Sequence, residues 1–281
     1  MVCCIWIHRY FSEHSEFVLR RKKGFLMIVK AYKFRSLRWN DCPYAQEIAR
    51  NRLRDLVSGK LYCSNWLSLN DVLEGVYRFS TEDLPQKRIL EIEKKILSFK
   101  KKLFVFCASV ATRNRCPLTD PLMWAHYADD HTGVAVELNL DLGRSRFAQI
   151  GEKDVESLFG PNPVRAIKRK VHYCRSNEYN YPIAEITKEN VDEKTAWLTA
   201  CEALLRKTVD WRHESELRIL SLSKTYEINV PERVSRVILG CRMNEDQERS
   251  VRSLLEDFHK VEVVSTRDKN ENQLLAAIRD N

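Results

Sequence analysis

The chain has 281 residues, of which 44% are hydrophobic and 31% charged, and its formal net charge is +8. This length suits one large domain or two small ones, and the composition is that of a globular protein. No run of about eighteen apolar residues occurs, so we expect no membrane-spanning segment. The positive charge suits an anionic ligand or a nucleic-acid partner but establishes neither.

The first residues and the cysteines indicate a cytoplasmic protein. The start of the chain lacks the uninterrupted apolar region of a signal peptide. Nine cysteines are an odd number, and none belongs to a C-x-x-C pair. Reduced thiols are therefore expected instead of a disulfide framework, and no metal site is predicted.

Residues 1–26 differ from the rest of the chain and are interpreted as a mobile N-terminal extension or an over-called start. The first strand is expected to begin at Met27, in the β-branched segment "MIVKAYKFRSL". Residues 27–281 are then expected to form a single domain.

Helical and strand patterns alternate after this strand. A helix is predicted from Pro43 to Ser58, ended by Gly59. The next expected elements are a strand followed by a turn at 60–69, a helix with its apolar stripe at 89–99 after the capping residues Ser80 and Thr81, a buried strand at 103–110, a short helix at 122–128, and strands at 134–140 and 170–175. A helix at 192–209, a charged strand at 211–220, a strand at 233–240, a helix capped by Asn244 and Gln247, a strand at 260–265 and a short helix near Leu274 complete the chain.

This order of elements predicts an α+β fold. The expected architecture is a single domain with a mixed, split β-sheet flanked by helices. The final strand, helix and strand indicate a parallel crossover connection.

The stretch "WRHESELRIL" is the most informative candidate site. As a strand it places Arg212, Glu214, Glu216 and Arg218 on one face. Such a ladder is either a solvated sheet face with weak ion pairs or a set of charges that converges on a ligand. Two carboxylates in a Glu-x-Glu pattern could reach one bound sugar, which favours the second interpretation.

Two further candidates precede this stretch. Arg35 ends the first strand, where its guanidinium could form a bidentate contact with a phosphate or could simply lie on the surface. Ser64 follows in the second strand and offers a hydroxyl to a ligand.

The segment "MWAHYADDHTGVAVEL" supplies three more candidates. Trp124 and Tyr127 could stack against a planar ring, with His131 forming a hydrogen bond beside them. The alternative is that Trp124 belongs to the core and that His131 is a cation at the end of a helix. The histidine spacing does not match a two-histidine zinc helix.

These motifs, in this order, resemble a bacterial family named only as domain of unknown function 2971. The resemblance rests on "AYKFRSL", "LYCSNWLSLNDVLEG", "MWAHYADDHTGVAVEL", "VHY", "WRHESELRIL" and "VILG". The family pattern Asn-Asp-Pro-Phe-Glu reads "NDVLE" in this chain, so its Pro-Phe pair is absent.

The order of Arg35, Ser64 and the two glutamates is also similar to that of ADP-ribosyltransferases. This resemblance implies an NAD-dependent enzyme, either an ADP-ribosyltransferase or an NAD glycohydrolase, with a nucleic acid or a protein as acceptor. It implies that Glu216 binds the ribose, that Glu214 aids the acceptor and that Arg35 binds a phosphate. It also implies that Arg212 and Arg218 either orient the carboxylates or contact an anionic acceptor. It further suggests a bacterial toxin or a phage-defence effector.

The rival interpretation is a non-catalytic nucleic-acid-binding or effector module. In that case the charge ladder is structural, and basic residues such as those of "RAIKRK" (residues 165–170) contact phosphates. A metal-dependent nuclease is a third interpretation, with Asp129, Asp130 and Glu137 as its candidate ligands.

Overall fold

The fold is α+β, as predicted, and is divided into two compact units. The computed structural model describes residues 17–21, 24–69, 75, 78–79, 85–112, 115–142, 166–175, 180–181, 193–229 and 232–267. Unit 1 comprises residues 1–62, 108–145 and 227–281, and unit 2 comprises residues 63–107 and 146–226. The prediction of one domain over 27–281 stays a prediction, and each unit is described by itself.

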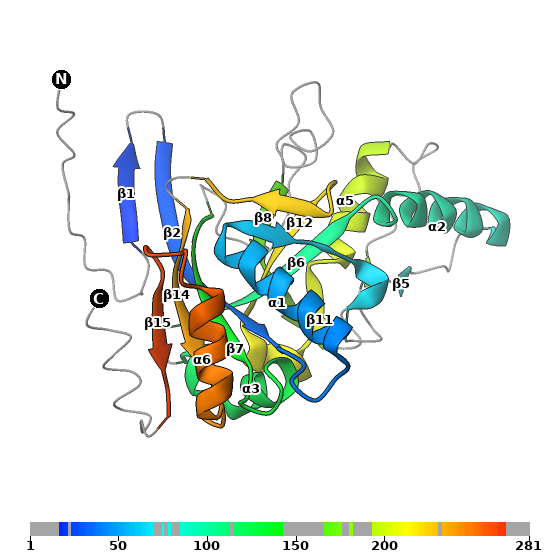
Figure 1. The fold of residues 1–281 in the computed structure, drawn as a ribbon. Helices are drawn as coiled ribbons and strands as arrows, with labels where there is room; N and C mark the ends of the chain where they lie inside the picture. Colours follow the sequence, from blue (N-terminus) through cyan, green and yellow to red (C-terminus); the bar gives the residue numbers. More distant parts are fainter. Residues whose placement is uncertain are drawn as a thin grey trace. The chain divides into compact units, whose positions relative to one another are not determined.

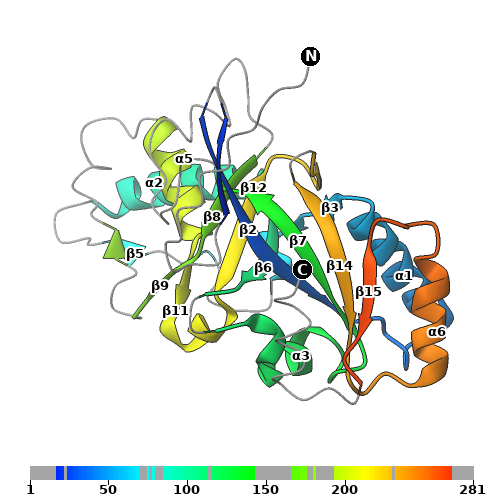
Figure 2. The same cartoon turned by 90° about the vertical axis from the view of Figure 1, so that its left-hand side faces the viewer.

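Unit 1 is a largely antiparallel sheet with helices against it. The strands of this sheet in unit 1 are β1 (Phe17–Arg21), β2 (Gly24–Arg35), β7 (Val134–Asp141), β14 (Arg233–Leu239) and β15 (Glu262–Ser265). The unit also contains β3 (Lys60–Tyr62), which belongs to a separate two-stranded sheet. Its helices are α1 (Pro43–Val57), η2 (Pro117–Thr119), α3 (Pro121–Tyr127) and α6 (Glu245–Leu254). Figure 2 shows β2, β7, β14 and β15 in that order. Helices α1 and α6 lie next to each other in Figure 1 and in Figure 2.

The sheet of unit 1 is mixed, as predicted. β2 pairs antiparallel with β7, and β7 pairs antiparallel with β14. β14 and β15, which α6 connects along the chain, pair parallel. The last residues of β6 (Phe104–Val110) pair with β2 at Ala31 and Tyr32. The capping pair is confirmed, because Asn244 and Gln247 form a reciprocal capping box at the start of α6.

Unit 2 contains the remaining described elements. These are β4 (Ser64–Asn65), η1 (Trp66–Ser68), β5 (Arg78–Phe79), α2 (Gln86–Lys100), β8 (Ala166–Lys170), β9 (His172–Cys174), β10 (Asn180–Tyr181), α5 (Glu193–Ala203), β11 (Arg206–Thr208), η5 (Val209–Glu214) and β12 (Glu216–Ser221). β12 is followed by β13 (Thr225–Glu227), at the boundary between the units. β12 pairs antiparallel with β8, and β4 pairs with the first residues of β6.

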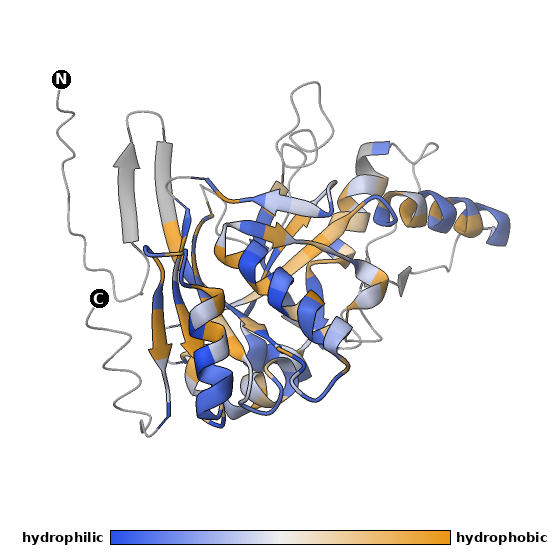
Figure 3. Ribbon diagram, in the orientation of Figure 1, coloured by the Kyte–Doolittle hydropathy of each residue, from blue (hydrophilic) through white to orange (hydrophobic). Residues whose placement is uncertain are grey.

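Helices α2 and α5 form the core of unit 2 with these strands. The ring of Phe99 stacks on that of Trp197 with 4.1 Å between centroids. Hydrophobic and hydrophilic residues alternate along α2 in Figure 3, which follows the predicted apolar stripe. Its N-cap residue is Pro85, whereas the predicted capping residues Ser80 and Thr81 lie outside the described residues.

Several predicted boundaries are wrong. β2 begins at Gly24 and not at Met27, and Phe17–Arg21 forms a strand paired with it. Residues 1–16, within the predicted extension, lie outside the described residues, as does the helix expected near Leu274. The helix expected at 192–209 ends at Ala203 and is followed by a strand and a 3₁₀ helix.

Candidate functional sites

The charged stretch of unit 2 is not one continuous strand. Trp211 to Glu214 belong to the 3₁₀ helix η5, Ser215 has a left-handed backbone with φ of 45°, and the strand begins only at Glu216. The predicted four-residue ladder is therefore wrong. The solvated alternative is wrong as well, because Glu214, Glu216 and Arg218 are 3%, 5% and 0% exposed.

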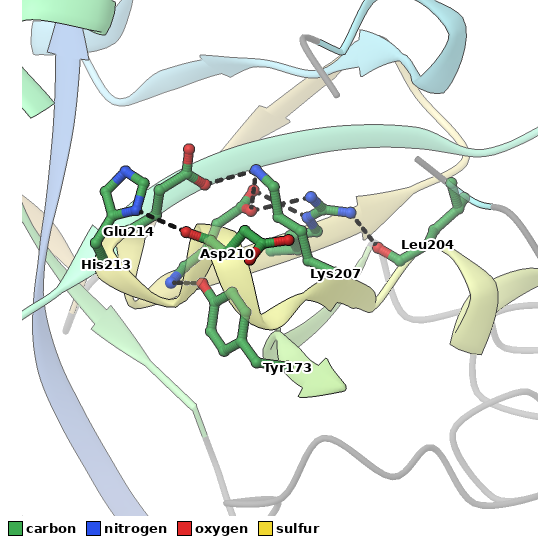
Figure 4. A network of polar contacts seen from close by, with 8 residues as sticks. Tyr173, Leu204, Lys207, Asp210, His213 and Glu214 are labelled. Carbon is green, nitrogen blue, oxygen red and sulfur yellow. Dashed lines mark hydrogen bonds and ion pairs between the residues drawn. The ribbon is translucent and has the colours of Figure 1, made fainter. Parts of the chain in front are cut away.

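The two glutamates instead form a buried ion-pair network with two cations. Arg218 donates from Nε and Nη2 to the two oxygens of Glu216, at 2.9 Å each. The amino group of Lys207 lies 2.6 Å from Glu214 Oε2 and 3.5 Å from Glu216 Oε2 (Figure 4). Two negative and two positive charges thus balance in an interior where an unpaired charge would be strongly disfavoured.

Backbone and aromatic groups complete this network. Arg218 Nη1 donates to the carbonyl of Leu204 at 2.7 Å, and the backbone N–H of Glu216 donates to the hydroxyl oxygen of Tyr173 at 2.8 Å (Figure 4). The amino group of Lys207 also lies 4.5 Å from the ring centre of Trp211. Both oxygens of Glu216 are therefore committed to protein partners.

The network keeps Glu216 ionised. Burial raises the pKa of this carboxyl, but the charge and hydrogen bonds of Arg218, with the charge of Lys207, outweigh burial and lower the pKa to about 2. Burial and the charge of Glu216 raise the pKa of Tyr173, so its phenol stays protonated. A carboxylate held in this way serves as a fixed counter-ion for Arg218.

Acid is expected to weaken this network. Because the folded pKa of Glu216 lies below its ordinary value of 4.5, its stabilisation is present above about pH 5 and is lost as the pH falls toward 2. Urea unfolding at pH 5, 4 and 3 measures this loss. We expect a Glu216→Leu/Arg218→Met double variant to lose less stability over the same interval, by up to about 2 kcal/mol. Equal losses in the two proteins would contradict this assignment.

Ser64 belongs to the same unit but not to this network. It lies in the short strand β4, opposite Val105 of β6, and is half-buried. The structure describes no hydrogen bond between Ser64 and either glutamate. Lys207, which joins the two glutamates, was missed by the sequence reasoning, because a single lysine after a helix carries no periodic signal.

In unit 1, Trp124 belongs to the core. Its indole N–H donates to the carbonyl of Leu118 at 2.8 Å, and its ring meets Phe34 edge-on at 5.1 Å. Its side chain is only 4% exposed, so of the two alternatives for Trp124 the structure favours the core and not a ligand-stacking ring. Tyr127 is half-buried against the same cluster.

His131 packs on this tryptophan. The two rings are nearly parallel, at 13°, with centroids 6.0 Å apart. Burial and the charge of Arg242 lower the pKa of His131, with Asp130 acting in the opposite direction. The lowered pKa favours the neutral imidazole. It therefore disfavours the alternative that His131 is a cation at the end of a helix.

Two of the segments on which the family resemblance rests meet at the end of β2. Asp129 accepts hydrogen bonds from the backbone of Leu37 and Arg38, and the indole N–H of Trp39 donates to the carbonyl of Thr132 at 2.9 Å. Gly133 follows this turn: a Cβ atom there would lie 2.3 Å from the carbonyl oxygen of Arg35. The motif residues around Trp124 thus fix the loop that follows Arg35.

The acidic residues considered for a nuclease have other partners. Glu137 is buried, where it pairs with Arg236 at 2.9 Å and accepts a hydrogen bond from Tyr32. Asp130 pairs with Arg242 on the surface. Among the described residues, no three His, Cys, Asp or Glu side chains are grouped so that they could hold a metal ion.

Arg35 lies among other arginines. Its side chain is half-buried, on the face of β2 opposite Phe34. Burial, with the positive charges of Arg52 and Arg38, lowers the pKa of Arg35 to about 10. Within the described part of the chain, no carboxylate lies within ion-pair distance of Arg35, although Arg38 itself pairs with exposed Asp41 at 3.3 Å.

Aromatic rings accompany these cations. The guanidinium of Arg52 lies 5.0 Å from the ring centre of Tyr62, and that of Arg50 lies 5.6 Å from the ring centre of Trp39. The buried Nε of Arg50 has no hydrogen-bond partner among the described residues. We call Arg35, Arg38, Arg50 and Arg52 the arginine cluster. The sequence reasoning found only Arg35, although "RNRLR" in α1 was a visible signal.

The basic segment "RAIKRK" does not form a surface patch of this kind. Ala166 to Lys170 are strand β8, in which Arg169 is 5% exposed. The amino group of Lys168 lies 5.2 Å from the ring centre of Tyr226. Arg165 lies outside the described residues. Arg169 is therefore a buried residue and not a surface cation.

Comparisons with known proteins support one family. Residues 123–219 match the family described as protein of unknown function (DUF2971). The match begins at Met123 of the central motif and ends at Ile219 of β12, so Arg35 and Ser64 lie outside it. No curated protein and no solved structure matches the chain, and the likeness to ADP-ribosyltransferases stays a prediction. The resemblance to the DUF2971 family is confirmed over residues 123–219.

Proposed function

We propose that unit 1 binds nucleic acid through the phosphate contacts of its arginine cluster, and that the buried glutamates of unit 2 have a structural role. The observation that carries the proposal is the half-buried guanidinium of Arg35, which faces the charges of Arg52 and Arg38 without a carboxylate partner among the described residues. Holding like charges together is unfavourable unless an anion joins them. Phosphate is an anion that guanidinium groups bind through two parallel hydrogen bonds.

The geometry disfavours catalysis by Glu216. A carboxylate that binds a ribose hydroxyl needs an accessible oxygen, and both oxygens of Glu216 accept hydrogen bonds from Arg218. NAD cleavage is nevertheless directly testable by measuring nicotinamide release from labelled NAD, with and without nucleic acid. We expect no release. A role as an effector in phage defence or in a toxin system stays a prediction.

Neutralising the cluster is expected to weaken binding without destabilising the fold. A double variant, Arg35→Gln with Arg52→Gln, should bind a labelled oligonucleotide at least about tenfold more weakly and reduce the salt dependence of binding by about two charges. Because burial disfavours the charge of Arg35, its replacement should leave the melting temperature unchanged or raise it. Fluorescence anisotropy at several salt concentrations, with thermal melts, provides both measurements.

Arg249 offers a matched control. It is an exposed arginine of α6 in the same unit and pairs with Asp246. Arg249→Gln removes one positive charge outside the cluster, so it should change affinity only slightly. Unaltered binding by the double variant would refute the cluster as the binding site. Equal weakening by the control would show that net charge and not the cluster attracts the nucleic acid.

A further inference from the structure

Tyr62 is an exposed aromatic ring beside the arginine cluster. It ends β3, where Leu61 points into the core and Tyr62 is 47% exposed. The guanidinium of Arg52 covers its ring at 5.0 Å. The ring is therefore held by a cation while much of its surface remains in water.

Trp39 differs from Tyr62 although it too lies beside an arginine. Its N–H is bound to the carbonyl of Thr132, and its ring is half-buried beneath Arg50. Trp39 thus stabilises the loop that follows β2. Tyr62, in contrast, has an exposed ring that a ligand bound to the arginine cluster can reach.

This combination suits a nucleic acid whose bases are accessible. Proteins that bind single strands combine cations that contact phosphates with aromatic rings on which bases stack. The bases of a duplex are stacked inside it and present only their edges, so they cannot cover a tyrosine ring. A guanidinium over the same ring adds a cation–π contact and lies within reach of a neighbouring phosphate.

We infer that the arginine cluster binds single-stranded nucleic acid, with an unpaired base stacked on Tyr62 next to Arg52. The inference rests on the proposed function and adds the ligand class. Phosphates contact Arg35 and Arg38, and the base covers the exposed part of the Tyr62 ring. Duplexes then bind more weakly, through phosphate contacts alone.

Three labelled probes test this assignment by fluorescence anisotropy on the full chain: a single-stranded oligonucleotide, an abasic strand of the same length, and the matching duplex. We expect the base-containing strand to bind about tenfold more tightly than the abasic strand. Tyr62→Leu keeps an apolar side chain but removes the ring, so it should abolish this preference while leaving the affinity for the abasic strand unchanged. Thermal melts confirm that the variant is folded.

Tyr44 supplies the control. It is a tyrosine at the start of α1 in the same unit, it is 72% exposed, and among the described residues no cation lies over its ring. Tyr44→Leu should retain the preference for bases. If the abasic strand binds as well as the base-containing strand, or if both leucine variants behave alike, base stacking on Tyr62 is refuted while binding through phosphates stands. If none of the three probes binds, the proposed function itself fails.

Discussion

Replacing Glu216 by glutamine is expected to lower the free energy of unfolding by about 3–5 kcal/mol, the usual effect of breaking one side of a buried ion pair. Glutamine keeps the shape of glutamate but cannot neutralise Arg218 and Lys207, which are 0% and 4% exposed. The melting temperature should fall by about 10 °C. The catalytic role implied by the resemblance to ADP-ribosyltransferases predicts the reverse: a stable variant that no longer consumes NAD.

Two control variants test whether the loss of the Glu216 charge causes the loss of stability. Glu227→Gln changes an exposed glutamate of β13 and should alter stability by less than about 0.5 kcal/mol. The Glu216→Leu/Arg218→Met double variant removes both charges of the bidentate pair, while Lys207 keeps its 2.6 Å contact with Glu214. It should recover most of the lost stability. A Glu216→Gln protein that unfolds like the unaltered chain would disprove the structural role.

Substituting alanine for Gly240 is expected to abolish stable folding of unit 1, with a cost above about 4 kcal/mol. A Cβ atom at this position would lie 2.1 Å from the carbonyl oxygen of His131 and 3.0 Å from that of Gly133. Both are backbone atoms, and Gly240 donates its own N–H to the Gly133 carbonyl at 2.9 Å. The clash therefore cannot be relieved by a change of rotamer. Soluble yield and urea unfolding measure the effect.

Gly59→Ala is the matched control in the same unit. Gly59 has a φ of +90°, so alanine there is strained, but the atom nearest to its Cβ would be Cγ1 of the Ile228 side chain, at 3.1 Å, and the nearest backbone atom would lie at an ordinary contact distance of 3.7 Å. We expect a cost of about 1–2 kcal/mol and a soluble protein. If Gly240→Ala proves no more harmful than Gly59→Ala, the close approach of the two backbones is not what requires glycine at position 240.

Elements with a strong local signal could be predicted from the sequence. The helix at Pro43–Val57 and the strands at Phe104–Val110 and Val134–Asp141 follow from apolar spacing, and the capping box follows from Asn244 and Gln247. The stretch from Trp211 to Glu214 was mistaken for a strand. Its alternation of charges has the period of a strand, whereas the 3₁₀ helix and the left-handed Ser215 depend on the contacts around them.

The candidate site was predicted less completely than the fold. The order of residues identified Arg35 but not its neighbour Arg52, because their proximity arises from packing between a strand and a helix. Trp124 was left open between a core residue and a ligand contact. Its bond to the carbonyl of Leu118 favours the core, and no sequence spacing reports such a bond.

The sequence by itself determined the α+β class, most helices and strands, and the resemblance to the DUF2971 family, because these depend on the period of apolar residues and on short motifs. Only the tertiary structure decided which charges are buried and paired. Glu216 and Arg35 were both predicted to bind a ligand. In the structure Glu216 is buried in unit 2 and paired with Arg218, whereas Arg35 lies near Arg38 and Arg52 in unit 1. Glu216 and Arg218 are two residues apart in the same strand, so their proximity follows from the strand period, but their burial depends on elements that packing brings together. The approach of Arg52 to Arg35 likewise depends on packing between distant parts of the chain.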